Sequence, residues 1–167
     1  THQMAILREA QKRGATLIVV DPFRTRTAEC ADWHVQPEHG TDSALALGMM
    51  HVIFREGLHD EQFLRAYTLG WEALRDRVLS EYSPARVSQI TGIPPEDIER
   101  LATMYATQRP SAIRLGYGIA RNSNGGMMVR TITCLPAIIG AWRELGGGLL
   151  LSTSAHFPLN MKAVKRP

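Results

Sequence analysis

The chain has 167 residues, about the length of one domain, and its 44% apolar and 21% charged residues are ordinary for a globular protein. Its 19 basic and 16 acidic side chains are scattered along the chain and leave a net charge of +3, which argues against a nucleic-acid partner. No apolar run approaches the roughly 20 residues of a membrane span, and the first residues lack the layout of a secretory signal, so direct membrane insertion is not expected.

Residues 3–12 carry apolar side chains at helical spacing and are followed by Gly14, which predicts a helix closed by a left-handed glycine. The run "TLIVV" (residues 16–20) then stops at Asp21 and Pro22. A short, continuous, β-branched run of this kind is typical of a strand buried on both faces of a parallel sheet. The order helix, strand, loop, helix therefore predicts an α/β domain.

The segment from Asp21 to Gly40 has little periodicity, apart from a short helical turn at residues 27–31 and an extended stretch after it. An amphipathic helix follows and runs to Gly57, and a side-chain oxygen of Thr41 or Asp42 is expected to cap it. Further helices are predicted for residues 61–67 (capped by Asp60), 71–79, 83–92 and 93–107.

Residues 111–118 indicate a second buried strand, followed by a polar loop and a long apolar helix that Pro136 is expected to kink. We expect an α/β fold with a small parallel sheet flanked by many helices, in a Rossmann-like arrangement. Residues 1–150 would form one domain, and residues 151–167 an extended tail without periodicity.

The first candidate site lies at the end of the first strand. Ligands of open parallel sheets bind outside the carboxyl ends of the strands, where Asp21 emerges. Its carboxylate can accept hydrogen bonds from a purine edge or a pair of ribose hydroxyls, Phe23 offers a stacking face, and Arg24 and Arg26 can bind a phosphate. The alternative is that Asp21 and Pro22 only end the strand and the arginines are solvated.

Two further segments can likewise be interpreted either as ligand-binding or as purely structural. In "HGTD" (residues 39–42), Gly40 lets the backbone approach a ligand and Asp42 opens a helix, although a plain helix cap explains the same residues. "LGYGIARNSNGG" (residues 115–126) does not fit the G-x-G-x-x-G dinucleotide pattern, because Arg121 stands where a glycine is needed. If the two predicted strands are neighbours, Tyr117, Arg121 and Asn124 would lie beside the first loop.

Metal-ligating and catalytic patterns are missing from this sequence. Cys30 and Cys134 belong to no CxxC pair and are expected to be buried small hydrophobes, and the six histidines do not pair at metal-ligand spacings. His51, among the apolar residues of its helix, is expected to be an interior side chain. The chain therefore reads as a segment that holds a ligand, with no catalytic residue and no metal ligand assigned.

Three stretches in this order, residues 10–53, 113–132 and 135–150, resemble the molybdopterin oxidoreductase family, the dimethyl sulfoxide reductase type that includes formate dehydrogenases and nitrate, thiosulfate or polysulfide reductases. In that family an arginine and a threonine usually follow the acid-proline turn, and a "PGTD" tetrad opens a helix. Here the turn reads "DPFRTRT" and the tetrad "HGTD", so His39 replaces the proline. The resemblance implies the formate dehydrogenase and dimethyl sulfoxide reductase fold.

It also implies binding of molybdenum bis(molybdopterin guanine dinucleotide). By position, residues 21–25 match the loop that wraps one guanosine, residues 40–42 match the segment whose acid binds the guanine edge, and residues 116–118 match a loop near the active site. "RNSNGG" (residues 121–126) matches a segment on the substrate or pterin side. The implied cofactor-binding residues are Asp21, Pro22, Phe23, Arg24, Thr25, Gly40, Thr41, Asp42, Gly116, Tyr117, Gly118, Arg121 and Asn124.

The chain lacks the family's iron-sulfur cysteines, the molybdenum-ligating residue and the C-terminal β-barrel domain, so we expect an internal segment that is inactive alone. Its partners would be the remaining domains of the parent polypeptide and an iron-sulfur electron-transfer subunit, and an iron-sulfur cluster would lie in the missing part. The compartment would be the cytoplasm, or the periplasm after folded export. Two alternatives stay open: a nicotinamide-dependent dehydrogenase domain in which Asp21 holds the adenosine ribose, and a non-catalytic helical interaction module.

Overall fold

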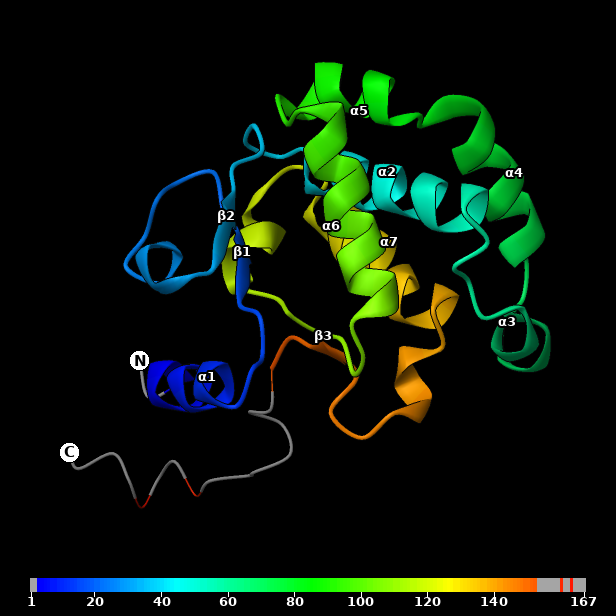
Figure 1. Cartoon of the computed structure of the whole chain (residues 1–167). Coiled ribbons are helices and arrows are strands. Elements are labelled where there is room, and N and C mark those ends of the chain that lie inside the picture. The colour runs from blue at the N-terminus through cyan, green and yellow to red at the C-terminus, as the bar shows by residue number, and fades with distance from the viewer. Residues whose placement is uncertain (1–2, 153–159, 161–162, 164–167) are drawn as a thin grey trace.

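The structure is a computed structural model that describes residues 3–152, 160 and 163 (Figure 1). Most of the tail predicted for residues 151–167 lies outside the described residues. The helices are α1 (Gln3–Lys12), α2 (Asp42–Arg55), α3 (Glu61–Tyr67), α4 (Trp71–Glu81), α5 (Pro84–Thr91), α6 (Pro95–Thr107) and α7 (Gly125–Ile138). The strands are β1 (Ile18–Val20), β2 (Trp33–Val35), β3 (Ala112–Arg114) and β4 (Gly148–Leu150), and the 3-10 helices are η1 (Ala28–Cys30), η2 (Tyr117–Arg121) and η3 (Ala141–Arg143).

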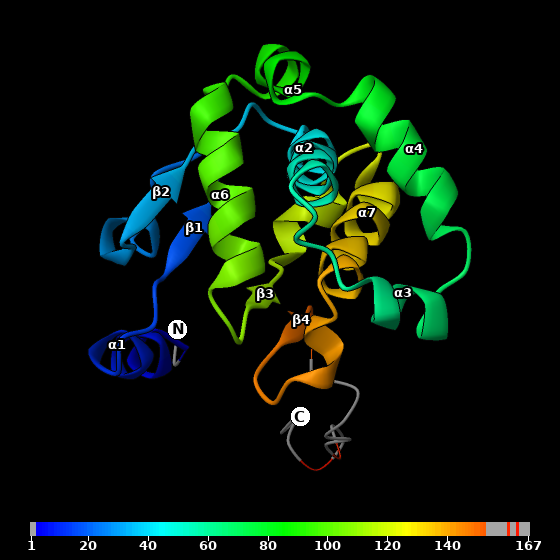
Figure 2. The same ribbon diagram turned by 45° about the vertical axis from the view of Figure 1, so that its right-hand side comes forward.

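Helix α2 is the centre of the core. It packs against α4, α5, α6 and α7, which surround it in Figure 2, and all but four of its 14 residues are buried. A helix that is apolar on nearly every side is stable only when it is enclosed in this way. Gly48 makes the enclosure tight, because a Cβ there would lie 3.0 Å from the Cγ atoms of Val87.

The strands form two separate parallel pairs. Ile18 pairs with Trp33 in one pair, and Ala112 pairs with Gly148 in the other. The predicted class, a helix-rich α/β fold with small parallel sheets, is confirmed, but the expectation that the first strand is buried on both faces is wrong. Val20 is 40% exposed, because β1 has a neighbouring strand on one side only among the described residues and α1, which precedes it, buries none of its residues.

Several local predictions agree with the structure. Helix α1 has the predicted bounds, and Gly14 after it has φ of +93°. Asp60 caps α3 by accepting a hydrogen bond from the backbone N–H of Phe63 at 2.8 Å. His51 is buried, and its Nδ1 lies 2.9 Å from the carbonyl oxygen of Val78, so it is an interior side chain as expected.

Three other local predictions need correction. No side-chain oxygen caps α2, because the hydroxyl of Thr41 donates instead to the carbonyl of Glu38 at 2.7 Å. Cys30 and Cys134 are half-buried rather than buried. The second predicted strand is shorter and less buried than expected, with Ala112 exposed.

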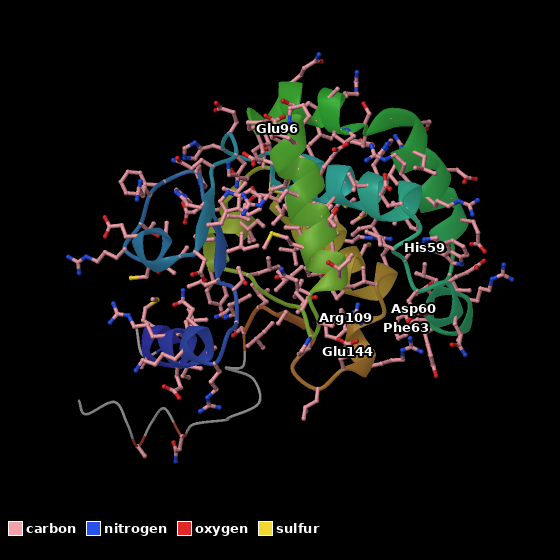
Figure 3. The ribbon with its side chains drawn as sticks, in the orientation of Figure 1. His59, Asp60, Phe63, Glu96, Arg109 and Glu144 are labelled. Atoms are coloured by element: carbon pink, nitrogen blue, oxygen red, sulfur yellow. The ribbon has the colours of Figure 1, made fainter. Side chains whose placement is uncertain are left out.

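Residues 141–150 carry structure that the periodicity analysis did not predict. Arg109, before β3, forms a bidentate ion pair with Glu144, whose two carboxylate oxygens lie 2.8 and 2.9 Å from its Nε (Figure 3). Arg109 also donates from Nη1 to the carbonyl of Ile139 at 2.7 Å. A second ion pair joins Arg143 of η3 to Asp60. These contacts hold the glycine-rich segment so that β4 can pair with β3.

Candidate functional site

The turn formed by residues 21–25, hereafter the DPFRT turn, leaves the carboxyl end of β1 as predicted. Oδ1 of Asp21 accepts a hydrogen bond from the N–H of Phe23 at 2.8 Å, and the N–H of Thr25 donates to the carbonyl of Phe23 at 2.9 Å. These two bonds curl the chain tightly, and the ring of Phe23 stands 72% exposed. Arg24 beside it is exposed as well. The turn therefore presents one carboxylate, one aromatic face and one guanidinium to the outside.

The tetrad of residues 39–42 brings a second carboxylate to this region. Gly40 has φ of +78°, a conformation that side-chain-bearing residues rarely adopt, and Asp42 is the first residue of α2. Burial raises the pKa of Asp42, the negative charge of Asp21 raises it further, and its own backbone N–H and His39 oppose the shift. Asp21 and Asp42 are thus close enough for their negative charges to repel each other.

The polar loop before α7 reaches the tetrad through Asn122. A Cβ placed on Gly40 would lie 3.5 Å from Oδ1 of Asn122 and 3.7 Å from Cε of Met128. At the other end of the loop, Gly125 lets helix α7 approach η2, because a Cβ at Gly125 would lie 2.7 Å from Cα of Ala120. The candidate loops are therefore joined, although β1 and β3 belong to different sheets and are not neighbours.

The remaining predicted residues of this loop lie on the surface. Tyr117 is 58% exposed, and Arg121 and Asn124 are exposed too. A Cβ at Gly116 or Gly118 would meet no atom within 4 Å. The space beside these two glycines is open, but no hydrogen bond or ion pair in the described part of the chain joins Tyr117, Arg121 or Asn124 to the DPFRT turn.

Three residues that the sequence analysis did not select also shape the site. His34 and Gln36 bond to backbone carbonyls of the DPFRT turn, and the side chain of Asn122 lies near Gly40. The alternation of apolar and polar residues in "WHVQ" was the available signal for His34 and Gln36.

Other features of the described residues lie away from this region. A surface cavity of about 350 Å³ is lined by Val52, Arg55, Glu56, Leu58, Glu99 and Thr103, and another of about 570 Å³ follows α1, so neither includes a predicted site residue. Within residues 3–152, no group of three or more His, Cys, Asp or Glu side chains is placed to hold a metal ion. The same part of the chain contains no helix with the length and apolar character of a membrane span.

The arrangement suits a flat ligand edge that carries several hydrogen-bond donors. Asp42 makes no side-chain hydrogen bond or ion pair with another described residue, although it is half-buried. A carboxylate in this situation gains most from a ligand that supplies two N–H donors, as N1 and N2 of guanine do. The exposed ring of Phe23 and the guanidinium of Arg24 add a stacking surface and a phosphate partner. The residues present therefore fit a guanine nucleotide.

Comparison with known proteins gives a consistent picture. The family model described as molybdopterin oxidoreductase matches residues 1–161. The chain is 50% identical to the probable oxidoreductase YoaE of Bacillus subtilis over 99% of its length, and 37% identical to formate dehydrogenase H of Escherichia coli over 78%. It spans 24% and 18% of those two proteins. The solved structure of acetylene hydratase from Pelobacter acetylenicus superposes with a TM-score of 0.79 at 40% identity, over 83% of this chain and 19% of that one.

Proposed function

Because the chain belongs to the molybdopterin oxidoreductase family, we propose that it is the segment of a longer enzyme that holds the guanosine and pyrophosphate part of molybdenum bis(molybdopterin guanine dinucleotide). The observation that carries this proposal is Asp42, a half-buried carboxylate that makes no side-chain hydrogen bond or ion pair with another described residue and whose pKa is raised by burial and by the charge of Asp21. Burying a carboxylate beside another negative charge is unfavourable for the free protein. A donor-bearing base that hydrogen-bonds to Asp42 offsets that cost.

Each predicted residue has a role in this proposal. Asp42 accepts hydrogen bonds from the guanine edge, with Gly40 and Thr41 shaping the approach. In the DPFRT turn, Asp21 accepts from the nucleoside, Phe23 stacks, Arg24 pairs with the pyrophosphate, and Pro22 and Thr25 fix the shape of the turn. The remaining predicted residues would line the cofactor toward the pterin: Gly116, Tyr117, Gly118, Arg121 and Asn124.

When bound, the molybdenum cofactor supplies the electron-transfer chemistry, while the residues of this chain bind and orient it. The parent enzyme in this proposal is a redox enzyme of the formate dehydrogenase, nitrate reductase, S-oxide reductase or thiosulfate reductase type. Its other domains, and an iron-sulfur subunit, would complete the active site and carry the electrons. Relatives of this segment are named for formate, for dimethyl sulfoxide and trimethylamine N-oxide, and for acetylene, so what they share is more general than one substrate.

The test uses the full-length protein that contains this chain. Guanine nucleotide released by acid hydrolysis, and molybdenum, are measured per polypeptide for the unchanged protein and for Asp42→Asn, which replaces an acceptor by a donor at nearly constant shape. We expect both contents to fall about tenfold or more in Asp42→Asn, because a buried donor would face the donors of guanine. Asp76→Asn, at an exposed carboxylate paired with Arg75, is the matched control.

An unchanged protein without guanine nucleotide would overturn the proposal, as would an Asp42→Asn variant that keeps both contents. Bound nicotinamide dinucleotide would favour the dehydrogenase alternative. A protein that holds neither guanine nucleotide nor nicotinamide dinucleotide would favour the interaction module. The chain expressed alone is expected to show no turnover of formate, nitrate or an S-oxide with an artificial electron carrier, because the substrate-contacting domains are missing.

A further inference from the structure

Strand β2 has one face toward the core and another toward the DPFRT turn. Side chains alternate across a strand, so Trp33 and Val35 share one face, and His34 and Gln36 share the other. Val35 is 3% exposed, and Trp33 lies under the guanidinium of Arg100, 4.4 Å from its ring centroid. The polar face is therefore held in place by the packing of the apolar one.

His34 of β2 and Gln36, the residue after β2, both bond to carbonyls of the turn. Nε2 of His34 lies 2.9 Å from the carbonyl oxygen of Asp21, and Nε2 of Gln36 donates to the carbonyl of Pro22 at 3.3 Å. The carbonyl is an acceptor only, so His34 must carry its proton on Nε2. The last backbone hydrogen bond between the two strands runs from the N–H of Asp21 to the carbonyl of Val35 at 3.1 Å. The side-chain bonds of His34 and Gln36 continue from that point.

These bonds fix two consecutive peptide planes. The carbonyl of Pro22 and the N–H of Phe23 belong to one planar unit. Gln36 holds the carbonyl side of this unit, and Oδ1 of Asp21 holds the N–H side at 2.8 Å. His34 holds the preceding unit through the carbonyl of Asp21. His34 and Gln36 thus hold the backbone from which the Asp21 carboxylate and the Phe23 ring project.

We propose that His34 and Gln36 are positioning residues that keep Asp21 and Phe23 in the nucleotide-binding geometry without touching the nucleotide. The inference rests on the proposed function, because it assigns a role at the same cofactor site. A ligand group held near its productive position binds more tightly than one that must be ordered on binding. Loss of either bond therefore weakens retention of the cofactor more than it weakens the fold.

The experiment uses full-length protein purified with its cofactor. The half-life of bound guanine nucleotide after dilution is measured together with the hydrogen exchange of the Phe23 and Thr25 amides. His34→Leu is expected to shorten the half-life about five- to tenfold and to speed exchange at both amides, the size expected for one lost hydrogen bond. His34→Gln, whose amide N–H₂ stands near the position of Nε2, is expected to restore both values to within about twofold.

A histidine with the same kind of bond elsewhere provides the control. His51 also meets a carbonyl at 2.9 Å, but it does so in the core at Val78. His51→Leu is expected to lower thermal stability without shortening the half-life of bound nucleotide. Gln36→Met, which keeps length and loses the donor, provides a second variant if His34→Leu fails to fold, with Gln89→Met at an exposed position of α5 as its control.

The outcomes separate the two proposals. Guanine nucleotide in the unchanged protein, with early release from His34→Leu or Gln36→Met only, supports the positioning role. If His34→Leu and Gln36→Met retain guanine nucleotide as long as the unchanged protein does, the positioning role is overturned and the proposed function stands. The same holds if His51→Leu releases the nucleotide as early as His34→Leu does. An unchanged protein that never held guanine nucleotide overturns both.

Discussion

Asp42 lies half-buried within electrostatic reach of Asp21, and the pKa of Asp42 is raised first by burial and then by the charge of Asp21. For a carboxyl whose pKa is higher in the folded state, the unfolded state ionises first as pH rises. The contribution of Asp42 to the free energy of unfolding is therefore fully present below the ordinary aspartate range. It is lost as pH rises through the raised value.

From this relationship we predict that Asp42→Asn makes the cofactor-free protein more stable at neutral pH while it abolishes retention of guanine nucleotide. Thermal unfolding of protein made without molybdate, followed from pH 3 to pH 8, measures the effect. The stability difference should shrink toward acid pH, where the aspartate of the unchanged protein is neutral too. An Asp42→Asn variant that is less stable than the unchanged protein at neutral pH would contradict the assignment of burial as the main cause.

The positive φ of Gly40 gives a second prediction. Gly40→Ala forces a side-chain-bearing residue to φ of +78°, and we expect the free energy of unfolding to fall by about 1–2 kcal/mol. The new Cβ itself has ordinary room, 3.5 Å from Oδ1 of Asn122, so the cost lies in the backbone. Denaturant unfolding measures it.

Gly126→Ala is the control for this substitution. Gly126 lies in α7 with nothing within 4 Å of its Cβ position, and alanine there should be neutral or stabilise by up to about 1 kcal/mol. Asn122→Ala should change stability by less than about 0.5 kcal/mol, because Asn122 is exposed, yet it should lower cofactor content. Equal stability losses in Gly40→Ala and Gly126→Ala would refute the role of the positive φ.

The ion pair between Arg109 and Glu144 gives a third prediction, on stability alone. Arg109→Met removes the pair and the bond to the carbonyl of Ile139, whereas Glu144→Gln removes only the charge. Because the pair is only partly shielded, we expect a cost of about 1–2 kcal/mol for Arg109→Met and under about 1 kcal/mol for Glu144→Gln. A double-mutant cycle in denaturant measures the coupling, which should weaken in high salt. A larger loss for Glu144→Gln than for Arg109→Met would show that the carbonyl bond contributes nothing.

The helices were predictable because their signals are local. Spacing and capping residues within a few positions fix α1 and α3, and the structure gives them the predicted bounds. Strand β4 was not predicted, because it begins at the last residue of a glycine run and pairs with β3, more than 30 positions away. The exposure of Val20 likewise depends on which strands are absent beside β1, and no local pattern carries that information.

The residues of the candidate site also differ in whether a local sequence signal identifies them. Asp21 and Asp42 were selected because each stands at an element end, a position that can be read from the sequence around it. His34 and Gln36 were not selected because they bond to backbone carbonyls. Every residue has one, so the sequence does not show which carbonyl accepts. Asn122 lies near Gly40 although more than 80 positions separate them in the sequence, so only the folded chain shows that they are neighbours.

The two strand pairs have a consequence for assembly. Within residues 3–152, every strand has one side that lacks a hydrogen-bonded strand neighbour. Such a side is a row of backbone donors and acceptors that an incoming strand can join without disturbing the existing ladder. A strand added at such a side would widen either sheet and leave the loops that carry Asp21 and Asp42 in place.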